Sequence, residues 1–549
     1  MKQLIHNGVL IPKYEHKKLH ILVKGKEINL TPQQEEMAVA WVRKLDTEYA
    51  KDPVFVKNFF RDFRKALNIN EDLSPEDFDF SKVRDYALKE KEVKLSFTRE
   101  EKKNLAQKRK ALRNTNKERY GYAIVDGIKV EISNYVVEPS SIFMGRGKHP
   151  LRGRWKNGAV EEDIILNLSP DAKIPEGRWK KIVWEPNSMW VAKWRDKLGR
   201  KMKYVWLSEA SSIRQEKEIE KYDGANELRS KIRKVRAHIW SHLQSEDAFV
   251  KKVATVSYLI DALSLRVGDE KDRDEANTVG ATTLRSNHIK IEGDGSAVFD
   301  FLGKDSVRWR KKIKLPELVV SNLREFIAEA KSTVFNGIGS KDVNLFLGEA
   351  MAGLTAKVFR TYHASSAVKS YLMGAKVSKS DPDHYKRYVA TMANLQAAIV
   401  CNHKKKVSDN WPRVLYKKQE AVEKSEDRVL KLKNKVMKRR EKIEELYAKR
   451  KDAKPKRKKT ITKRIKRERQ QLQKDLKRLS KSKENVDEKK TKITLMKKTK
   501  GYNLNTSLKS YIDSRIVYEW SKDIGFDWRL YYPKTLQRKF SWVDNNRLT

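Results

Sequence analysis

The chain has only one cysteine, Cys401, among its 549 residues. A single cysteine excludes an intramolecular disulfide framework and a multi-cysteine metal site, and it fits a reducing, intracellular compartment. No apolar run is long enough to span a membrane, and the first residues lack the apolar segment of a signal peptide. The phosphate-binding P-loop pattern is also missing, which argues against the use of ATP.

Positive charge is what the chain has in excess. Lys and Arg number 121 against 73 Asp and Glu, a formal net charge of +48. A charge of this size predicts a polyanionic partner. The 13 Trp, 20 Tyr and 17 Phe argue against wholesale disorder, because aromatic residues on this scale indicate hydrophobic cores.

The first 213 residues are predicted to combine a helical lobe with a β-rich part. Short apolar runs before residue 30 indicate strands, and a Thr31-Pro32 start followed by apolar residues at helical spacing predicts a helix. A phenylalanine-rich helix and a charged helical stretch at 91–120 follow, so about 20–105 should form the helical lobe. Short β runs and a hairpin between 190 and 207 make 106–213 β-rich. In this part a glycine-rich loop carries Arg146 and His149, which either contact phosphates or are simply solvated.

Residues 214–405 are predicted to be a mainly helical core with one small sheet. Helical patterns run from Ile213 to about Leu284 and again over 317–403. Three strand-like runs lie between them, joined by two glycine-containing turns. The second turn, Gly303-Lys304-Asp305, puts Lys304 at a hairpin tip, where its side chain can enter a groove.

Residues 406–492 are predicted to be an antiparallel two-helix coiled coil. Apolar residues recur every seven positions in two arms, and the basic stretch 451–459, which contains Pro455, is the expected turn. Polar residues at the other heptad position, such as Ser425 and Arg439, indicate a weak seam. The charge of the arms is either solvated or faces DNA. Residues 493–549 should form a small helical domain that packs back on the main body.

This last segment contains Tyr511, the candidate nucleophile. A tyrosine is usually a half-buried helix residue, and its ordinary pKa near ~10 leaves it protonated at neutral pH. It becomes a nucleophile only when cations stabilise the phenolate and the group that it attacks. Four motifs supply cations, and with Tyr511 last they resemble the eukaryotic-type DNA topoisomerases of class IB: Leu263-Ser-Leu-Arg266-Val-Gly-Asp-Glu-Lys271, Phe301-Leu-Gly-Lys304-Asp-Ser306, Leu354-Thr-Ala-Lys-Val-Phe-Arg360-Thr-Tyr362 and Ile399-Val-Cys-Asn-His403.

The resemblance covers nearly the whole chain and implies a reaction. In this family a tyrosine attacks a DNA phosphodiester, expels the 5′ oxygen and leaves a 3′-phosphotyrosine, so that supercoils relax by strand rotation and religation. Arg266, Arg360 and His403 would stabilise the non-bridging oxygens. Lys304 would protonate the leaving oxygen. One ester replaces another, so neither ATP nor an essential divalent metal is expected.

The resemblance also implies a fold and a partner. The fold would be an α+β multidomain DNA clamp, with a helical core of the tyrosine-recombinase/topoisomerase IB type. The partner is double-stranded DNA, bound with tolerance of sequence by a monomer associated with the chromosome. The implied DNA contacts are Arg146, His149, Lys203, Lys271, Thr278, Asp305, Lys357, Thr506 and Ser510.

Three departures from the family pattern bear on drugs and on origin. Ser510 stands where eukaryotic members typically have Asn, and Met144 stands where an additional Arg is common. Since the residue before the nucleophile contacts camptothecin-type inhibitors in this family, we expect reduced sensitivity. The chain also starts almost at the core, which fits an archaeal or otherwise minimal version. The expected location is the cytoplasm and nucleoid if the protein is archaeal and the nucleus if it is eukaryotic.

Two other functions are compatible with parts of the pattern. A tyrosine recombinase shares the catalytic set and the strand chemistry, but the basic two-helix segment and the glycine-rich basic loop favour the topoisomerase. A non-catalytic architectural protein would only clamp DNA, and the presence of all five catalytic residue types argues against it.

Overall fold

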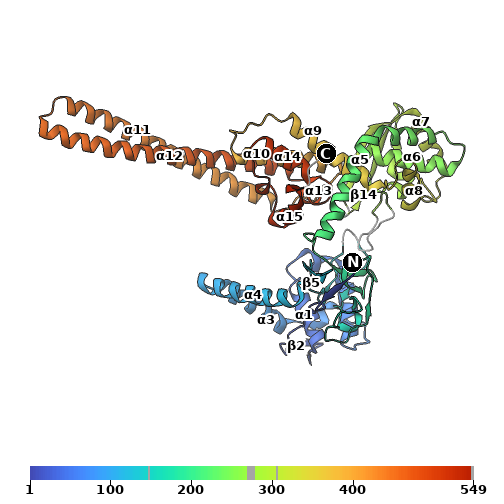
Figure 1. Cartoon of the computed structure of the whole chain (residues 1–549). Helices are drawn as coiled ribbons and strands as arrows, with labels where there is room; N and C mark the ends of the chain where they lie inside the picture. Colours follow the sequence, from blue (N-terminus) through green and yellow to red (C-terminus); the bar gives the residue numbers. More distant parts are fainter. Residues whose placement is uncertain (146–148, 269–277, 305–306, 546–549) are drawn as a thin grey trace. The chain divides into compact units, whose positions relative to one another are not determined.

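The computed structural model describes residues 1–145, 149–268, 278–304 and 307–545 (Figure 1). The predicted contacts Arg146, Lys271 and Asp305 lie outside these residues. The chain divides into two compact units. The first unit contains Met1–Asp223, Val267–Asp342 and Arg538–Ser541 and mixes strands with helices. The second contains Gly224–Arg266, Val343–Gln537 and Trp542–Thr549, and its described elements are helical.

A phenylalanine-rich core organises the helical lobe of the first unit. Helix α1 (Pro32–Val42) begins with a capping box at Thr31, as predicted, and α2 (Pro53–Ala66) buries Phe55, Phe59 and Phe63 completely. These helices share a core with the small sheet of β2 (His20–Val23), β3 (Lys26–Asn29) and β4 (Phe78–Asp79).

The charged helical stretch predicted at 91–120 is helical but is divided between two helices. Helix α3 (Ser81–Ser96) ends before Phe97, and α4 (Arg99–Tyr120) begins with a capping box between Thr98 and Glu101. The cap satisfies backbone donors at the start of α4, which explains why the chain breaks there. Helix α4 therefore crosses residue 105, where the sequence predicted the end of the lobe.

Three further sheets form the β-rich part. One has the order β1-β5-β6 (Leu4–His6, Tyr122–Val125 and Ile128–Glu131). The second has the order β10-β9-β11-β12 (Lys181–Val183, Ile165–Asn167, Trp190–Arg195 and Met202–Trp206). The predicted hairpin of β11 and β12 is confirmed as an antiparallel pair. Strands β7 (Ser141–Ile142) and β8 (Trp155–Lys156) pair on either side of the basic loop.

The small sheet of the predicted core also belongs to the first unit. Strands β13 (Ile289–Ile291), β14 (Ser296–Gly303) and β15 (Val307–Lys314) form the expected antiparallel sheet, followed by α7 (Glu317–Glu329). Gly303 pairs with Val307, so Lys304 directly follows the last pair of the hairpin.

The helical run predicted from Ile213 to about Leu284 is wrong for the described residues after Leu263. Helix α5 (Ser212–His242) and α6 (Ala248–Leu263) are present, but Ser264 is left-handed with φ 53° and ends α6. A left-handed residue turns the chain out of the helix. The described residues from there to 284 contain only a short 3-10 turn at Ala281–Thr283.

The second unit packs two tail helices on the central ones. Its central helices are α8 (Ser340–Ala350), α9 (Ala356–Gly374) and α10 (Asp383–Val400). Helix α13 (Leu504–Ser510) contacts α10, and α14 (Ser514–Asp523) contacts α9, before the short α15 (Lys534–Lys539). The tail therefore packs back as predicted. Among the described residues, no helix has the length and apolar character needed to cross a membrane.

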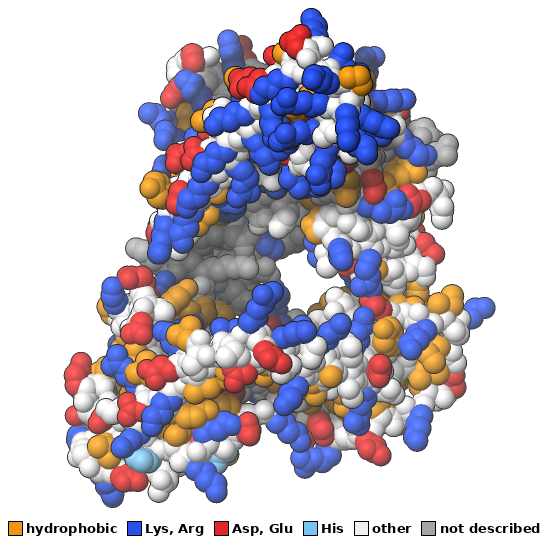
Figure 2. All heavy atoms as spheres, turned by 90° about the vertical axis from the view of Figure 1, so that its left-hand side faces the viewer, with side chains coloured by type: hydrophobic (Ala, Val, Ile, Leu, Met, Phe, Trp, Pro, Cys, Tyr) orange, Lys and Arg blue, Asp and Glu red, His pale blue; other side chains and the backbone are white. Residues whose placement is uncertain are grey.

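Helices α11 (Trp411–Lys451) and α12 (Pro455–Thr499) form the predicted antiparallel pair (Figure 1). The turn is shorter than expected, residues 452–454, because Pro455 occupies the first turn of α12, where its missing N–H is harmless. Predicted seam residues such as Val436, Ile443 and Leu479 are buried. Lys and Arg crowd the surface of the hairpin where Figure 2 views it from its free end. Helix α12 continues past 492, the predicted end of the coiled coil.

Candidate active site

Two helix ends present Arg266 and His403. After α6, left-handed Ser264 lies two residues before Arg266, and after α10 a second left-handed residue, Asn402 with φ 51°, lies directly before His403. Such residues end helices because they redirect the chain while leaving the last carbonyls open to other donors.

Arg360 of α9 joins these two helix ends. Its Nη1 donates to the carbonyl of Ser264 at 2.5 Å, and its Nη2 donates to the carbonyl of Cys401 at 3.0 Å. Carbonyls at a helix C-terminus favour a cation, so the side chain is held although it is only 4% exposed. Its Nε is buried and finds no hydrogen-bond partner within the described chain. One guanidinium thus orders both segments and retains an unused donor.

His403 lies between Arg360 and a serine. Its Nε2 is 3.2 Å from Nη2 of Arg360, and its Nδ1 is 3.0 Å from Oγ of Ser507. Burial, and then the charges of Arg360 and Arg266, lower the pKa of His403 from 6.5 to about 3. The imidazole is therefore neutral at physiological pH and can give or take a single hydrogen bond at each nitrogen.

Tyr511 directly follows α13 and is 5% exposed. Its backbone is held on both sides, because its N–H donates to the carbonyl of Ser507 at 2.9 Å and its carbonyl accepts from Oγ of Ser365 at 3.2 Å. The guanidinium carbon of Arg360 lies 5.0 Å from the centre of the phenol ring, and the ring of His403 lies 5.2 Å away.

The electrostatics favour the phenolate of Tyr511. Burial by itself raises the pKa of Tyr511, but the charges of Arg360 and Arg266, helped by a hydrogen bond from Arg360, outweigh it and lower the pKa below its ordinary value. The second unit thus brings together four of the five predicted catalytic residues, namely Arg266, Arg360, His403 and Tyr511. A phenolate beside fixed donors is suited to attack an anionic ester.

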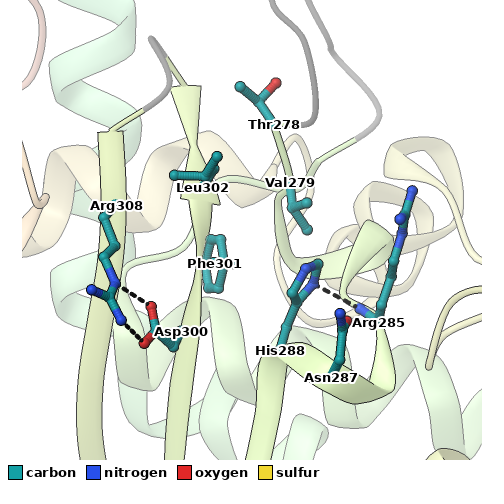
Figure 3. Close-up of a pocket in the computed structure, with 9 residues that line it drawn as sticks. All are labelled: Thr278, Val279, Arg285, Asn287, His288, Asp300, Phe301, Leu302 and Arg308. Carbon is teal, nitrogen blue, oxygen red and sulfur yellow. Dashed lines mark hydrogen bonds and ion pairs between the residues drawn. The ribbon is translucent and has the colours of Figure 1, made fainter. Parts of the chain in front are cut away.

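Lys304 belongs to the first unit, exposed at the end of β14. Thr278 lies beside the same strand, because the N–H of Val279 donates to the carbonyl of Leu302 at 2.8 Å. Thr278 borders a pocket of about 360 Å³, whose cations include Arg308, paired with Asp300 (Figure 3). Lys304 and Thr278, both predicted from sequence to act at the DNA, therefore lie near the same end of β14.

The other predicted contacts have varied surroundings. Lys357 is exposed on α9, three residues before Arg360, while Thr506 and Ser510 of α13 are partly exposed. Nζ of Lys203 lies 3.5 Å from Glu138. His149 is only 6% exposed, and its Nδ1 accepts from the N–H of Leu151 at 3.1 Å, so in this structure it stabilises its own loop.

Sequence reasoning missed Ser365 and Ser507, which hold Tyr511 and His403. The one available signal was the position of Ser507, four residues before Tyr511 on a helix, since such residues lie on the same face. In the described residues, no group of three or more His, Cys, Asp or Glu side chains is arranged to hold a metal ion.

Three family models match the chain in succession. "Eukaryotic DNA topoisomerase I, DNA binding fragment" matches residues 1–207, "Eukaryotic DNA topoisomerase I, catalytic core" matches 210–443, and "C-terminal topoisomerase domain" matches 483–548. All three are topoisomerase models, which favours the topoisomerase over the recombinase.

The curated relatives of the chain are also type I DNA topoisomerases by name. DNA topoisomerase 1 beta of Arabidopsis thaliana is 38% identical over 417 residues, which is 74% of this chain and 45% of the relative. DNA topoisomerase 1 of Candidozyma auris is 36% identical over 422 residues, 74% of this chain and 56% of the relative. The human DNA topoisomerase 1 is 34% identical over 425 residues, which is 74% of this chain and 54% of the relative. The chain spans about half the length of these relatives. It belongs to the eukaryotic-type DNA topoisomerase IB family, with a DNA-binding fragment, a catalytic core and a C-terminal domain in that order.

Proposed function

We propose that the chain relaxes supercoiled double-stranded DNA, without ATP or an essential metal, by transient cleavage of one strand. The observation that carries this proposal is the buried phenol of Tyr511, whose pKa is lowered by Arg360 and Arg266. Arg360 also makes a cation–π contact with the ring of Tyr511, which is a structural role, but two permanent cations that lower the pKa of a buried phenol are the environment that a tyrosine nucleophile needs.

In the proposed reaction, the oxygen of Tyr511 attacks the phosphorus of a DNA phosphodiester. The bond to the 5′ oxygen breaks, and a 3′-phosphotyrosine forms. The charge that develops on the non-bridging oxygens would be stabilised by Arg266, by the unused Nε donor of Arg360 and by His403. Religation is the reverse reaction, with the free 5′ hydroxyl as nucleophile.

Lys304 is proposed to protonate the leaving 5′ oxygen. It is an exposed cation at the end of a two-stranded hairpin, a shape that fits a groove of DNA. Because Lys304 belongs to the first unit, this role would require both units to engage the same duplex. The clamp-like arrangement expected from sequence is part of this proposal.

DNA binding should be tolerant of sequence and should weaken steeply with salt. The net charge of +48 and the proposed contacts Lys203, Thr278, Lys357, Thr506 and Ser510 suit a backbone-dominated interface. Arg146, His149, Lys271 and Asp305 remain proposed contacts on the family resemblance alone. We propose that the protein acts as a monomer on chromosomal DNA.

The test is relaxation of a negatively and a positively supercoiled plasmid in EDTA without nucleotide. The wild-type chain should relax both, and Tyr511→Phe should bind DNA but relax neither. Relaxation that depends on ATP or Mg²⁺ would contradict the proposed chemistry. Binding without relaxation by the wild-type chain would instead support an architectural protein.

A further inference from the structure

Ser507 connects His403 to the helix that ends at the nucleophile. Its side chain contacts Nδ1 of His403 at 3.0 Å, and its carbonyl accepts from the N–H of Tyr511 at 2.9 Å. A second hydrogen bond joins the same two segments, because the carbonyl of His403 accepts from the N–H of Asn503 at 2.7 Å. Ser507 is fully buried, so water does not compete for its hydroxyl.

The hydrogen-bond network assigns the proton of the imidazole. A guanidinium has only donors, so at the 3.2 Å contact with Arg360 the Nε2 of His403 must accept. The single ring proton of the neutral imidazole then lies on Nδ1 and is donated to Oγ of Ser507. In this arrangement Nε2 has no proton to give to a phosphoryl oxygen.

A hydroxyl is the one simple group that suits both forms of the ring. It accepts when Nδ1 carries the proton, and after rotation it donates when Nδ1 is bare and Nε2 carries the proton. Exchange between the forms removes one proton from Nδ1 and adds one to Nε2, with water as source and sink, so the charge of the ring does not change. Alanine offers neither hydrogen bond.

We propose that Ser507 is a positioning residue, which holds the ring of His403 in place and allows Nε2 to change from acceptor of Arg360 to donor toward the substrate phosphate. This inference rests on the proposed function. It assigns to Ser507 no contact with the reacting atoms. Its effect is on the reaction step, and not on the affinity for DNA.

The experiment compares Ser507→Ala and Ser507→Thr with the wild-type chain in single-turnover cleavage of a duplex oligonucleotide. Ser507→Ala should cleave about tenfold more slowly at saturating protein, with an unchanged dissociation constant for DNA, because one buried hydrogen bond is lost. Ser507→Thr keeps the hydroxyl and should restore most of the rate.

Ser514→Ala is the matched control. Ser514 is also fully buried near Tyr511, but its hydroxyl has no hydrogen-bond partner among the described residues. It should cleave like the wild-type chain. If Ser507→Ala and Ser514→Ala lose thermal stability alike and both keep the wild-type cleavage rate, the role of Ser507 is structural and the proposal is wrong.

A second readout does not depend on catalysis. With ¹⁵N-histidine labelling, and with His403→Gln to assign the signal, the wild-type ring should show a hydrogen-bonded proton on Nδ1. Because Arg360 still requires Nε2 to accept, Ser507→Ala should keep this tautomer but lose the hydrogen bond, seen as a shifted Nδ1 proton signal and faster exchange of that proton with water. An Nδ1 proton with the same shift and the same exchange rate in Ser507→Ala overturns the proposal. Failure of the proposed function is distinct, because then the wild-type chain itself would form no covalent adduct.

Discussion

Replacing Arg360 tests how the site activates its tyrosine. Two contributions are lost in Arg360→Ala. Its charge lies about 5.0 Å from the phenol ring. Coulomb's law with an effective dielectric constant of about 20 makes a charge at this distance worth roughly 3 kcal/mol, or about 10²-fold in a step that develops phenolate. Loss of a transition-state donor costs about 10²–10³-fold by itself. We therefore expect cleavage to slow by at least about 10²-fold.

Arg360→Lys separates charge from geometry. Lysine retains a cation, but its compact ammonium cannot donate to the carbonyls of both Ser264 and Cys401. Its rate should fall between those of the wild-type chain and Arg360→Ala. The rate of Arg360→Ala should also rise more steeply with alkaline pH, because its phenol is harder to ionise.

The assay is single-turnover cleavage of an oligonucleotide that cannot religate, measured from pH 6.5 to pH 9.5. Thermal unfolding is the control, since each carbonyl left without a donor costs about 1–3 kcal/mol of stability. The reasoning is refuted if folded Arg360→Ala cleaves within about threefold of the wild-type rate at pH 7.5.

Three further predictions concern the hairpin, the residue before the nucleophile and a buried histidine. Replacing 411–499 by a short connection should preserve cleavage and change salt sensitivity, as measured by covalent adduct formation, because the hairpin contains none of the five proposed catalytic residues; a folded variant without any adduct would contradict this. Ser510→Asn should increase camptothecin-trapped adducts several-fold, as for one regained hydrogen bond of ~0.5–1.5 kcal/mol, and equal dose curves would exclude Ser510 as the determinant. Burial lowers the pKa of His6 from 6.5 to about 4. The unfolded chain therefore binds more protons between these values, and the first unit should lose about 2 kcal/mol of stability from pH 7 to pH 5. His6→Gln should remove that loss in thermal unfolding, and an unchanged pH dependence would show that His6 is not the cause.

Much of the fold could be predicted because local signals agree with it. The Thr31-Pro32 start predicted a helix that Thr31 does cap. The seven-residue repeat of apolar residues predicted the long helical hairpin. The ion pairs between the polar side chains in the seam of that hairpin could not be predicted. Arg439 donates from Nε to Asp475 at 3.0 Å and also pairs with Glu468, so a seam judged weak from its polar residues contains a partly exposed ion-pair network around the buried Asp475.

The proposed catalytic residues were identified from motifs, but the residues that position them were not. Ser264 ends α6 in a left-handed conformation, which sequence analysis expects mainly at glycine. Its carbonyl accepts a hydrogen bond from Arg360, which lies 96 residues later in the sequence. Ser365 holds the backbone of Tyr511 from another helix. Such contacts depend on packing between segments that are distant in sequence, and local periodicity does not predict them.

The most direct test of the account is to locate the covalent bond to DNA. The wild-type chain is incubated in EDTA with a radiolabelled duplex, stopped with detergent and digested, and the nucleotide-bearing peptide is identified by mass spectrometry. The account predicts a 3′-phosphonucleotide on Tyr511 and no adduct in Tyr511→Phe. A nucleotide on any other residue, or a detergent-stable adduct formed by folded Tyr511→Phe, would contradict it.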